Sequence, residues 1–271
     1  MLKPATVTAL SAAAIAIAFA CPPARALEPF KTYDNFTAAG INPDLWNEWE
    51  RSRSVKKGAL NLLQRSWGLN TADTGSSFYL FNTNIANPVP VTELRAKVTV
   101  NALEVNACAT NAAIGGSRAR IIGSFFNVGT PVAGSELGDV LAQVRFNRFS
   151  NSLDAAGVLR VQGVAFVCDD AQCLTSTLIG SVVDLGTVNV GQAATVQLQW
   201  DKANKQFLFG RDAGAFSGAV AYTQSDADAP GLPFAQVSTR TDIPSCLAGP
   251  RVTGYVDATF DNVAVNKSAA P

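Results

Sequence analysis

The sequence predicts an all-β fold built from two antiparallel sheets packed face to face. The clearest segments alternate polar and apolar residues with a period of 2, turn residues such as Gly and Asn recur at short intervals, and no segment carries a sustained helical stripe. Of the 271 residues, 48% are hydrophobic and 15% are charged, which excludes a disordered chain and a coiled coil. The low charge and bulky core favour a sandwich over a closed barrel.

The first 26 residues have the pattern of a secretory signal. An apolar run over residues 5–20 precedes Ala24-Arg25-Ala26, a small-x-small cleavage site, so the mature chain would begin at Leu27. The alternative is lipidation at Cys21. The run is shorter than the roughly 20 residues that span a bilayer, and no later segment is apolar for as long. We therefore expect an exported, periplasmic or extracellular protein without a transmembrane segment, with a signal over 1–26 and one domain over 27–271.

Several segments after the signal are predicted strands. In Leu94 to Val100 the apolar residues fall on even positions and the polar ones on odd positions, so they lie on opposite faces. A polar turn at 201–205 separates two further segments and predicts a hairpin. The predicted strands are 94–100, 119–127, 140–149, 158–168, 195–200, 206–210 and 254–265.

Four cysteines remain after signal cleavage, an even number in a chain bound for an oxidising compartment, and they predict two disulfides. Four cysteines allow three pairings. The short loop from Cys168 to Cys173 favours a local bridge, which leaves Cys108 to pair with Cys246. A metal site is the competing hypothesis, but the chain has no His and lacks two close Cys pairs.

The composition excludes several classes of function. The absence of His removes every Ser-His-Asp or Cys-His catalytic arrangement and every His-containing zinc or haem site. Lys plus Arg and Asp plus Glu are equal at 21 each, so no whole-chain basic excess indicates a nucleic-acid partner. No glycine-rich phosphate-binding motif follows a strand, and nucleotide use is not indicated.

Both ends of the domain resemble a known family. Tyr-Asp-Asn-Phe at 33–36, Gly-Ile-Asn-Pro-Asp-Leu-Trp at 40–46 and the Gly-Ala-Leu-Asn-Leu strand at 58–62 resemble the opening of concanavalin A-like lectin/glucanase jelly rolls. Residues 254–265 are similar to the closing strand of that superfamily, which lies next to the first. The resemblance implies a LamG-like jelly roll whose ligand lies on the concave sheet.

The motifs of the enzymatic members are not matched. Laminarinase-like enzymes carry Glu-x-Asp-x-(x)-Glu, and the nearest acidic pair, Glu136 and Asp139, lacks the second Glu. Alginate-lyase-like members carry Arg-x-Glu-Leu-Arg and Gln-x-His. Thr92-Glu93-Leu94-Arg95 matches the first only in part, and the His is missing. The resemblance therefore implies a non-catalytic member.

Rows of planar polar residues suggest a glycan-binding face, because amides and guanidinium groups make hydrogen bonds of fixed geometry to hydroxyls. The competing interpretation is a solvated outer sheet face. The rows are Gln143, Arg145 and Asn147; Arg160 and Gln162; and Gln197 and Gln199. An aromatic face can also stack on a sugar ring, which adds Trp46 and Trp67, the latter in a loop, whereas Trp200 is expected in the core. The candidate ligand-binding residues are Arg145, Asn147, Arg160, Gln162, Trp67 and Trp46.

Two sets of carboxylates have weaker candidate roles. Glu48 and Glu50 would share a strand face about 6.5–7 Å apart, within the spacing of a glycosidase pair, although alternating acids are also common on a solvated face. Asp34, Asp257 and Asp261 would meet if the first and last strands are neighbours, and could hold a structural Ca²⁺. The plainer alternative is that Asp261 accepts backbone hydrogen bonds at a turn.

Together these observations predict an exported, disulfide-containing jelly-roll protein that binds a carbohydrate, with no recognisable catalytic residues and no required cofactor. A structural calcium is a candidate. One alternative is a polysaccharide hydrolase or lyase with an atypical carboxylate site. Another is a structural or adhesive extracellular protein.

Overall fold

The computed structural model describes residues 32, 34, 37, 41–212 and 216–270. The chain divides into two compact units, Met1–Thr37 and Ala38–Pro271, and every strand named below belongs to the second. The predicted signal at 1–26, Cys21 and Leu27 lie outside the described residues. In the described part of the chain, no helix has the length and apolar character needed to cross a bilayer.

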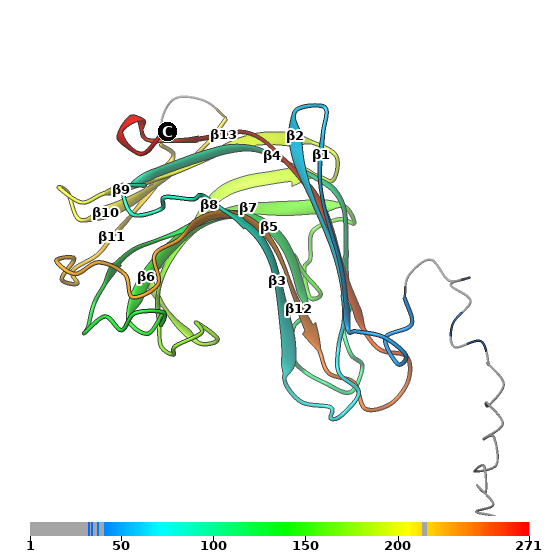
Figure 1. Cartoon of the computed structure of the whole chain (residues 1–271). Helices are drawn as coiled ribbons and strands as arrows, with labels where there is room; N and C mark the ends of the chain where they lie inside the picture. Colours follow the sequence, from blue (N-terminus) through cyan, green and yellow to red (C-terminus); the bar gives the residue numbers. More distant parts are fainter. Residues whose placement is uncertain (1–31, 33, 35–36, 38–40, 213–215, 271) are drawn as a thin grey trace, which may run out of the picture. The chain divides into compact units, whose positions relative to one another are not determined.

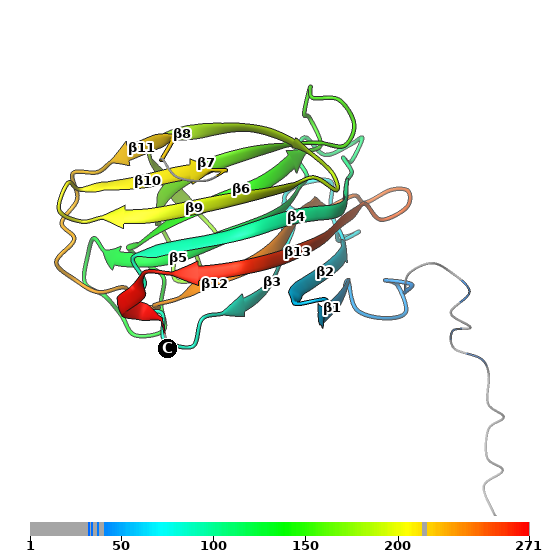
Figure 2. The same ribbon diagram turned by 90° about the horizontal axis from the view of Figure 1, so that it is seen from above.

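The second unit is a sandwich of two antiparallel sheets (Figures 1 and 2). The seven-stranded sheet has the order β1 (Trp49–Lys56), β2 (Ala59–Trp67), β13 (Thr253–Val265), β4 (Glu93–Val105), β9 (Ala193–Asp201), β10 (Gln206–Arg211) and β11 (Gly218–Ala221). The six-stranded sheet has the order β3 (Ser76–Asn84), β12 (Ala235–Pro244), β5 (Gly116–Asn127), β6 (Asp139–Phe149), β7 (Val158–Cys168) and β8 (Ser176–Asn189). A short 3-10 helix, η1 (Lys267–Ala269), follows β13.

The strand order confirms the two-sheet antiparallel jelly-roll sandwich expected from the sequence. β13 pairs antiparallel with β2 on one side and with β4 on the other, so the opening and closing strands are neighbours, as the resemblance implies. The hairpin predicted around the turn at 201–205 is formed by β9 and β10. The predicted strand at 158–168 coincides with β7.

The core lies between the two sheets and follows the predicted alternation. On β4 the even-numbered residues from Leu94 to Val100 are buried, whereas Arg95 and Lys97 are exposed. Trp200 packs against this core and stacks on the ring of Phe126, 5.6 Å between centroids, as expected. The inner faces of both sheets are therefore mainly apolar, apart from the buried Gln64 of β2, which hydrogen-bonds Thr239 and Thr241 of β12 across the sandwich.

Both predicted disulfides are confirmed. Cys108 is bonded to Cys246, with 5.8 Å between their Cα atoms, and joins the segment after β4 to the segment after β12. Cys168 is bonded to Cys173, with 4.8 Å between their Cα atoms, and closes the loop between β7 and β8. The first bridge connects the two sheets, and the second fixes a single loop.

Candidate functional site

A groove of about 520 Å³ lies on the outer face of the six-stranded sheet. Figure 1 shows that this sheet is curved and that its concave side faces away from the seven-stranded sheet. All six strands contribute to the groove, together with the disulfide loop before β8 and the segment before β12. Its polar lining includes Asn82, Asn84, Arg118, Arg120, Glu136, Gln143, Arg145, Gln236 and Arg240, and its apolar lining includes Phe78, Leu174, Leu178, Leu232 and Phe234.

Strand alternation places arginines in the groove. On β5, Arg118 and Arg120 line the groove. The residues that alternate with them, Ala119 and Ile121, are fully buried in the core. The same alternation on β6 brings Arg145 to the groove. A strand with one apolar and one polar face thus supplies fixed guanidinium groups to a rigid surface.

Two of these arginines share one carboxylate. Arg118 and Arg240 both form ion pairs with Asp242, and Arg240 Nε also donates a hydrogen bond to it at 2.8 Å. The carboxylate is 14% exposed and the Arg118 side chain 10%, so the pair lies nearly out of contact with solvent. Charge-assisted hydrogen bonds of this kind hold the two guanidinium groups in a fixed orientation.

The other two arginines are held by neutral acceptors. Arg120 donates from Nε to Ser238 Oγ at 3.0 Å and from Nη1 to Gln143 Oε1 at 2.9 Å. Arg145 donates from Nε and Nη2 to Gln162 Oε1, at 3.3 and 3.0 Å. These partners orient the guanidinium groups without neutralising their charge.

Burial and mutual repulsion act on all of these cations. Desolvation and the nearby Arg240 and Arg145 hold the pKa of Arg118 well below its ordinary value. The same causes lower the pKa of Arg120 to about 9, and desolvation followed by Arg240 lowers that of Arg145 to about 10. Desolvation also lowers the pKa of Arg240. Each lowered pKa has burial as its largest cause, because burial disfavours the charged form.

Apolar side chains complete the groove. Phe78 on β3 is 37% exposed, and the guanidinium of Arg240 lies over its ring, 4.6 Å from the centroid. Leu174, Leu178 and Leu232 are also exposed. The groove therefore offers both oriented hydrogen-bond donors and apolar surface, the combination typical of small-ligand sites.

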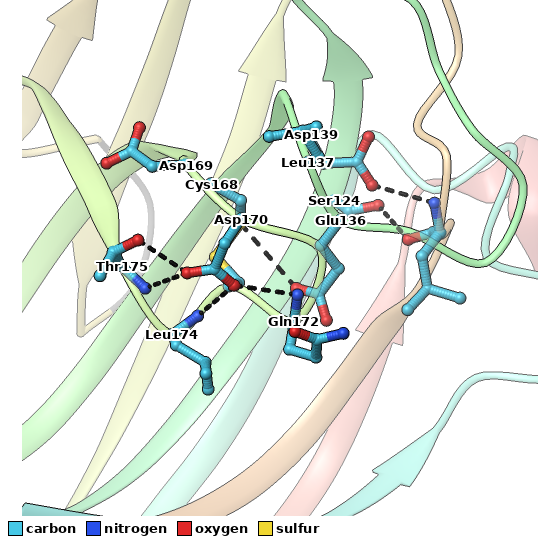
Figure 3. Close-up of a disulfide and its surroundings, with 12 residues drawn as sticks. Ser124, Glu136, Leu137, Asp139, Cys168, Asp169, Asp170, Gln172, Leu174 and Thr175 are labelled. Carbon is cyan, nitrogen blue, oxygen red and sulfur yellow. Dashed lines mark hydrogen bonds between the residues drawn. A yellow bond between two sulfur atoms is a disulfide. The ribbon is translucent and has the colours of Figure 1, made fainter.

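A buried carboxylate fixes one wall. Asp139, at the start of β6, is fully buried and accepts hydrogen bonds from the backbone N–H groups of Gly231 and Leu232, at 2.7 and 2.9 Å, and from Asn127 Nδ2 at 2.7 Å. Figure 3 shows it beside Ser124, whose hydroxyl donates to the Leu232 carbonyl at 3.0 Å. These contacts position the segment before β12 that lines the groove.

The disulfide loop is the adjoining wall and is organised by Asp170. Its carboxylate accepts from the backbone N–H groups of Gln172, Leu174 and Thr175 and from the Thr175 hydroxyl, at 2.7–3.0 Å (Figure 3). These hydrogen bonds hold the pKa of Asp170 below its usual range. The Cys168 to Cys173 bridge closes the same loop, so it presents Gln172 and Leu174 to the groove in one conformation.

Glu136 lies between these two walls and is half-buried. Desolvation, followed by the charge of Asp139, raises the pKa of its carboxyl group. Its carboxylate and the sulfur atoms of Cys168 and Cys173 lie within 4.8 Å of one another, a spacing that could suit a metal ion. Because the two sulfurs are bonded to each other, they are not thiolate ligands, and the cluster is not a metal centre.

The structure brings some predicted binding residues together. Arg145 lines the groove, and Gln162, its hydrogen-bond partner, lies directly opposite on β7. Asn147 is buried, at 2% exposed, and does not line the groove. Arg160 is exposed but is engaged by Asp154 at 2.7 Å, and it too lies outside the groove lining. The predicted row on β9, with Gln197 and Gln199, belongs to the other sheet.

One predicted tryptophan and the carboxylate pair lie where β1 begins and β2 ends. Trp67 is not in a loop: it is the last residue of β2, 7% exposed, whereas Trp46 is 44% exposed and precedes β1. Glu48 lies one residue before β1, and its carbonyl accepts the Trp67 backbone N–H at 2.9 Å, so the shared face of Glu48 and Glu50 stays a prediction. The Glu50 carboxylate accepts the backbone N–H of residue 41 at 3.0 Å and pairs with the Arg65 guanidinium at 3.6 Å.

Two of the three aspartates predicted to bind calcium, Asp257 and Asp261, have separate partners. Asp257 accepts hydrogen bonds from Asn61 Nδ2 at 2.6 Å and Asn101 Nδ2 at 3.0 Å. Asp261 lies 4.0 Å from Lys97 Nζ. Asp34 belongs to the first unit. The calcium site stays a prediction.

Sequence reasoning missed most of the groove. Arg118 and Arg120 could have been found, because they alternate with apolar residues at the start of the predicted strand at 119–127. Arg240 and Phe78 had no comparable signal, since β12 and β3 were not predicted as strands. Glu136 was noted only as half of an incomplete motif.

No protein-family model and no curated protein sequence matches the chain. Among solved structures, it is similar to a GlcNAcα1-4Gal-releasing endo-β-galactosidase from Clostridium perfringens, at 9% identity over 84% of this chain and 61% of that chain, with a TM-score of 0.34. It is also similar to the carbohydrate recognition domain of Emp46p, at 9% identity over 86% and 97% of the chains and TM-score 0.32. A third similar structure is the exoplasmic/lumenal domain of VIP36, at 7% identity over 80% and 84% and TM-score 0.35. This chain therefore spans less than two thirds of the Clostridium enzyme.

Proposed function

We propose that this chain is an exported carbohydrate-binding, lectin-like protein and that the groove on the six-stranded sheet is its binding site. The observation that carries the proposal is the combination of fixed planar hydrogen-bonding groups and exposed apolar side chains in one hollow of about 520 Å³. Guanidinium and amide groups suit the paired hydroxyls of a sugar, and an exposed ring such as Phe78 suits the C–H face of a pyranose. Both disulfides and the signal pattern at 1–26 support export.

Binding without turnover is the form of the proposal that the groove supports best. Glycoside hydrolysis generally uses two carboxyl groups about 5–10 Å apart across the scissile bond. Among the described residues that line the groove, Glu136 is the one acidic side chain. The chain also has no His to act as a general base.

The test is a screen of the oxidised full chain against a glycan array and soluble polysaccharides, with size analysis of each polysaccharide that binds. We expect saturable binding and an unchanged polymer length. Phe78→Ala should weaken binding by about threefold to tenfold, from the loss of one aromatic contact. Trp49→Ala is a matched control, because Trp49 is 38% exposed, also lies under an arginine, at 4.4 Å from Arg51, and belongs to the other sheet.

Three results would contradict the proposal. Shortened or unsaturated polymer would indicate a hydrolase or lyase. Absence of saturable binding to every carbohydrate would favour a structural or adhesive role. An equal loss of binding in Phe78→Ala and Trp49→Ala would move the site away from the groove.

A further inference from the structure

The groove concentrates positive charge on three neighbouring strands. Arg240 on β12 is directly opposite Arg118 on β5, and Arg120 on β5 is directly opposite Arg145 on β6. Adjacent strands are about 4.8 Å apart, and like charges directly opposite one another destabilise a sheet. Two such pairs side by side are unfavourable unless negative charge compensates them.

The described carboxylates only partly supply that compensation. Asp242 is shared by Arg118 and Arg240, and Glu136 faces the groove from the far wall. Arg120 and Arg145 contact uncharged acceptors. Four guanidinium groups therefore meet two carboxylates, although the whole chain has equal numbers of acidic and basic residues.

One of the two buried arginines also has an unused donor. Arg118 is 8% exposed, and among the described residues its Nε atom is buried without a hydrogen-bond partner. A buried donor without a partner is destabilising, more so when it is charged. Because a guanidinium group remains protonated at neutral pH, the protein cannot relieve this penalty by releasing a proton.

An anion in the groove offsets the repulsion between these arginines. The planar guanidinium fork matches carboxylate and sulfate groups, which accept two parallel hydrogen bonds. Arg145 and Arg240 are each partly exposed, so a ligand can reach them directly. Phe78, beneath Arg240, places apolar surface next to the charge, which suits an acidic group carried on a sugar ring.

We propose that the groove recognises an anionic polysaccharide, with Arg145 and Arg240 binding its carboxylate or sulfate groups. This inference rests on the proposed function. The carbohydrate-binding proposal identifies the ligand as a polysaccharide, and the positive charge of the groove indicates that this polysaccharide is acidic. Carboxylate and sulfate ester groups both carry a negative charge and several acceptor oxygens, so the groove does not discriminate between them by charge. The experiment separates them.

The experiment measures binding of the oxidised full chain to matched polymers that differ only in charge. Polygalacturonate is compared with its fully methyl-esterified form, and dextran sulfate with dextran. We expect the charged member of at least one pair to bind ten times more tightly or better, and the pair that responds identifies carboxylate or sulfate as the ligand group. Affinity for that polymer should fall as salt is raised, since the contacts are ionic.

Arginine variants test whether the tighter binding of the charged polymer arises in the groove. Arg145→Gln and Arg240→Gln should each weaken binding of the charged polymer about tenfold, the loss expected for a charge-assisted hydrogen bond. Arg145→Lys keeps the charge but loses the fork and should be weakened less than Arg145→Gln. Arg95→Gln is the matched control, because Arg95 is exposed on the outer face of the other sheet and its loss removes the same charge. Thermal unfolding confirms that each variant is folded, and the wild-type comparison of charged and neutral polymers decides the question even if one variant is not.

These measurements distinguish failure of the anionic-ligand inference from failure of the carbohydrate-binding proposal. Equal binding of charged and neutral polymers, weakened by Phe78→Ala, would overturn the anionic ligand and leave the carbohydrate-binding site in place. Binding of none of these polymers and of nothing on the glycan array would overturn both proposals. A loss in Arg95→Gln as large as in Arg145→Gln would show that the attraction is unspecific and would also overturn the inference.

Discussion

The two disulfides are expected to contribute differently to stability. The bridge from Cys108 to Cys246 spans 138 positions of sequence, and that from Cys168 to Cys173 spans 5. In the chain-entropy model, the first lowers the free energy of folding by about 5 kcal/mol and the second by about 2 kcal/mol. We therefore expect the double variant C108A/C246A to lose about 3 kcal/mol more stability than C168A/C173A.

The loss of polysaccharide binding in the two double variants should follow the opposite order from their loss of stability. Cys173 lines the groove with Gln172 and Leu174, and the short bridge fixes their loop. The long bridge instead belongs to a separate apolar cluster with Ile243 and Val252, outside the groove lining. C168A/C173A should thus weaken polysaccharide binding more than C108A/C246A, although it is the more stable of the two.

Urea unfolding followed by tryptophan fluorescence gives both stabilities, and the slopes of ΔG against urea show whether the unfolded states remain comparable. Binding is then measured at a temperature where both variants are folded. Equal or reversed losses of stability would refute the loop-entropy argument. Stronger impairment of binding in C108A/C246A would refute the role of the short bridge as a groove wall.

Three further predictions concern other positions. Gly163→Ala on β7 should destabilise the protein by about 1–3 kcal/mol in urea unfolding, because an added Cβ would overlap the buried ring of Phe209; unchanged stability would refute this. Asp139→Asn should cost about 1–3 kcal/mol, because an amide nitrogen cannot accept the backbone N–H bonds that the carboxylate receives; unchanged stability would contradict this. Burial raises the folded-state pKa of Glu136 above 4.5, so its contribution to stability is present below that pH and lost as the pH rises through the raised pKa. The stability of Glu136→Gln relative to the wild type should therefore rise as the pH increases above 4.5, and a stability difference that does not change with pH would refute the raised pKa. The charged groups that act on Glu136 are Asp139, Arg120 and Asp170.

The sequence was sufficient for the fold because the strands that build the core alternate regularly. Residues 94–100 and 158–168 each show a local pattern that the structure retains, and the cysteine spacing in the 168–173 loop favoured the correct pairing. The strands that were not predicted lack this pattern. β8 is exposed at most positions and has irregular pairing with β7, and β12 is largely buried on both faces although it is rich in Ser and Thr.

The carboxylate pair shows a second limit of local reasoning. Glu48 and Glu50 are two residues apart, and the prediction of a shared face required a strand through both positions. Strand β1 begins one residue after Glu48, although the Glu48 carbonyl still accepts the Trp67 backbone N–H at 2.9 Å, so the shared face stays a prediction. The prediction for Trp67 was wrong, because its position at the end of β2 suggested a loop although tertiary packing covers it.

The groove depends on strand pairing, which a single sequence does not reveal. Alternation places Arg118 and Arg120 on one face of β5, but it does not say which strands lie beside β5. Only the insertion of β12 between β3 and β5 brings Arg240 opposite Arg118, and only the pairing with β6 brings Arg145 opposite Arg120. The equal totals of acidic and basic residues argue against a nucleic-acid binder, yet they conceal this local excess of arginine. A balanced composition therefore constrains the charge of the whole surface, whereas the charge of a site is set by the register of the strands that form it.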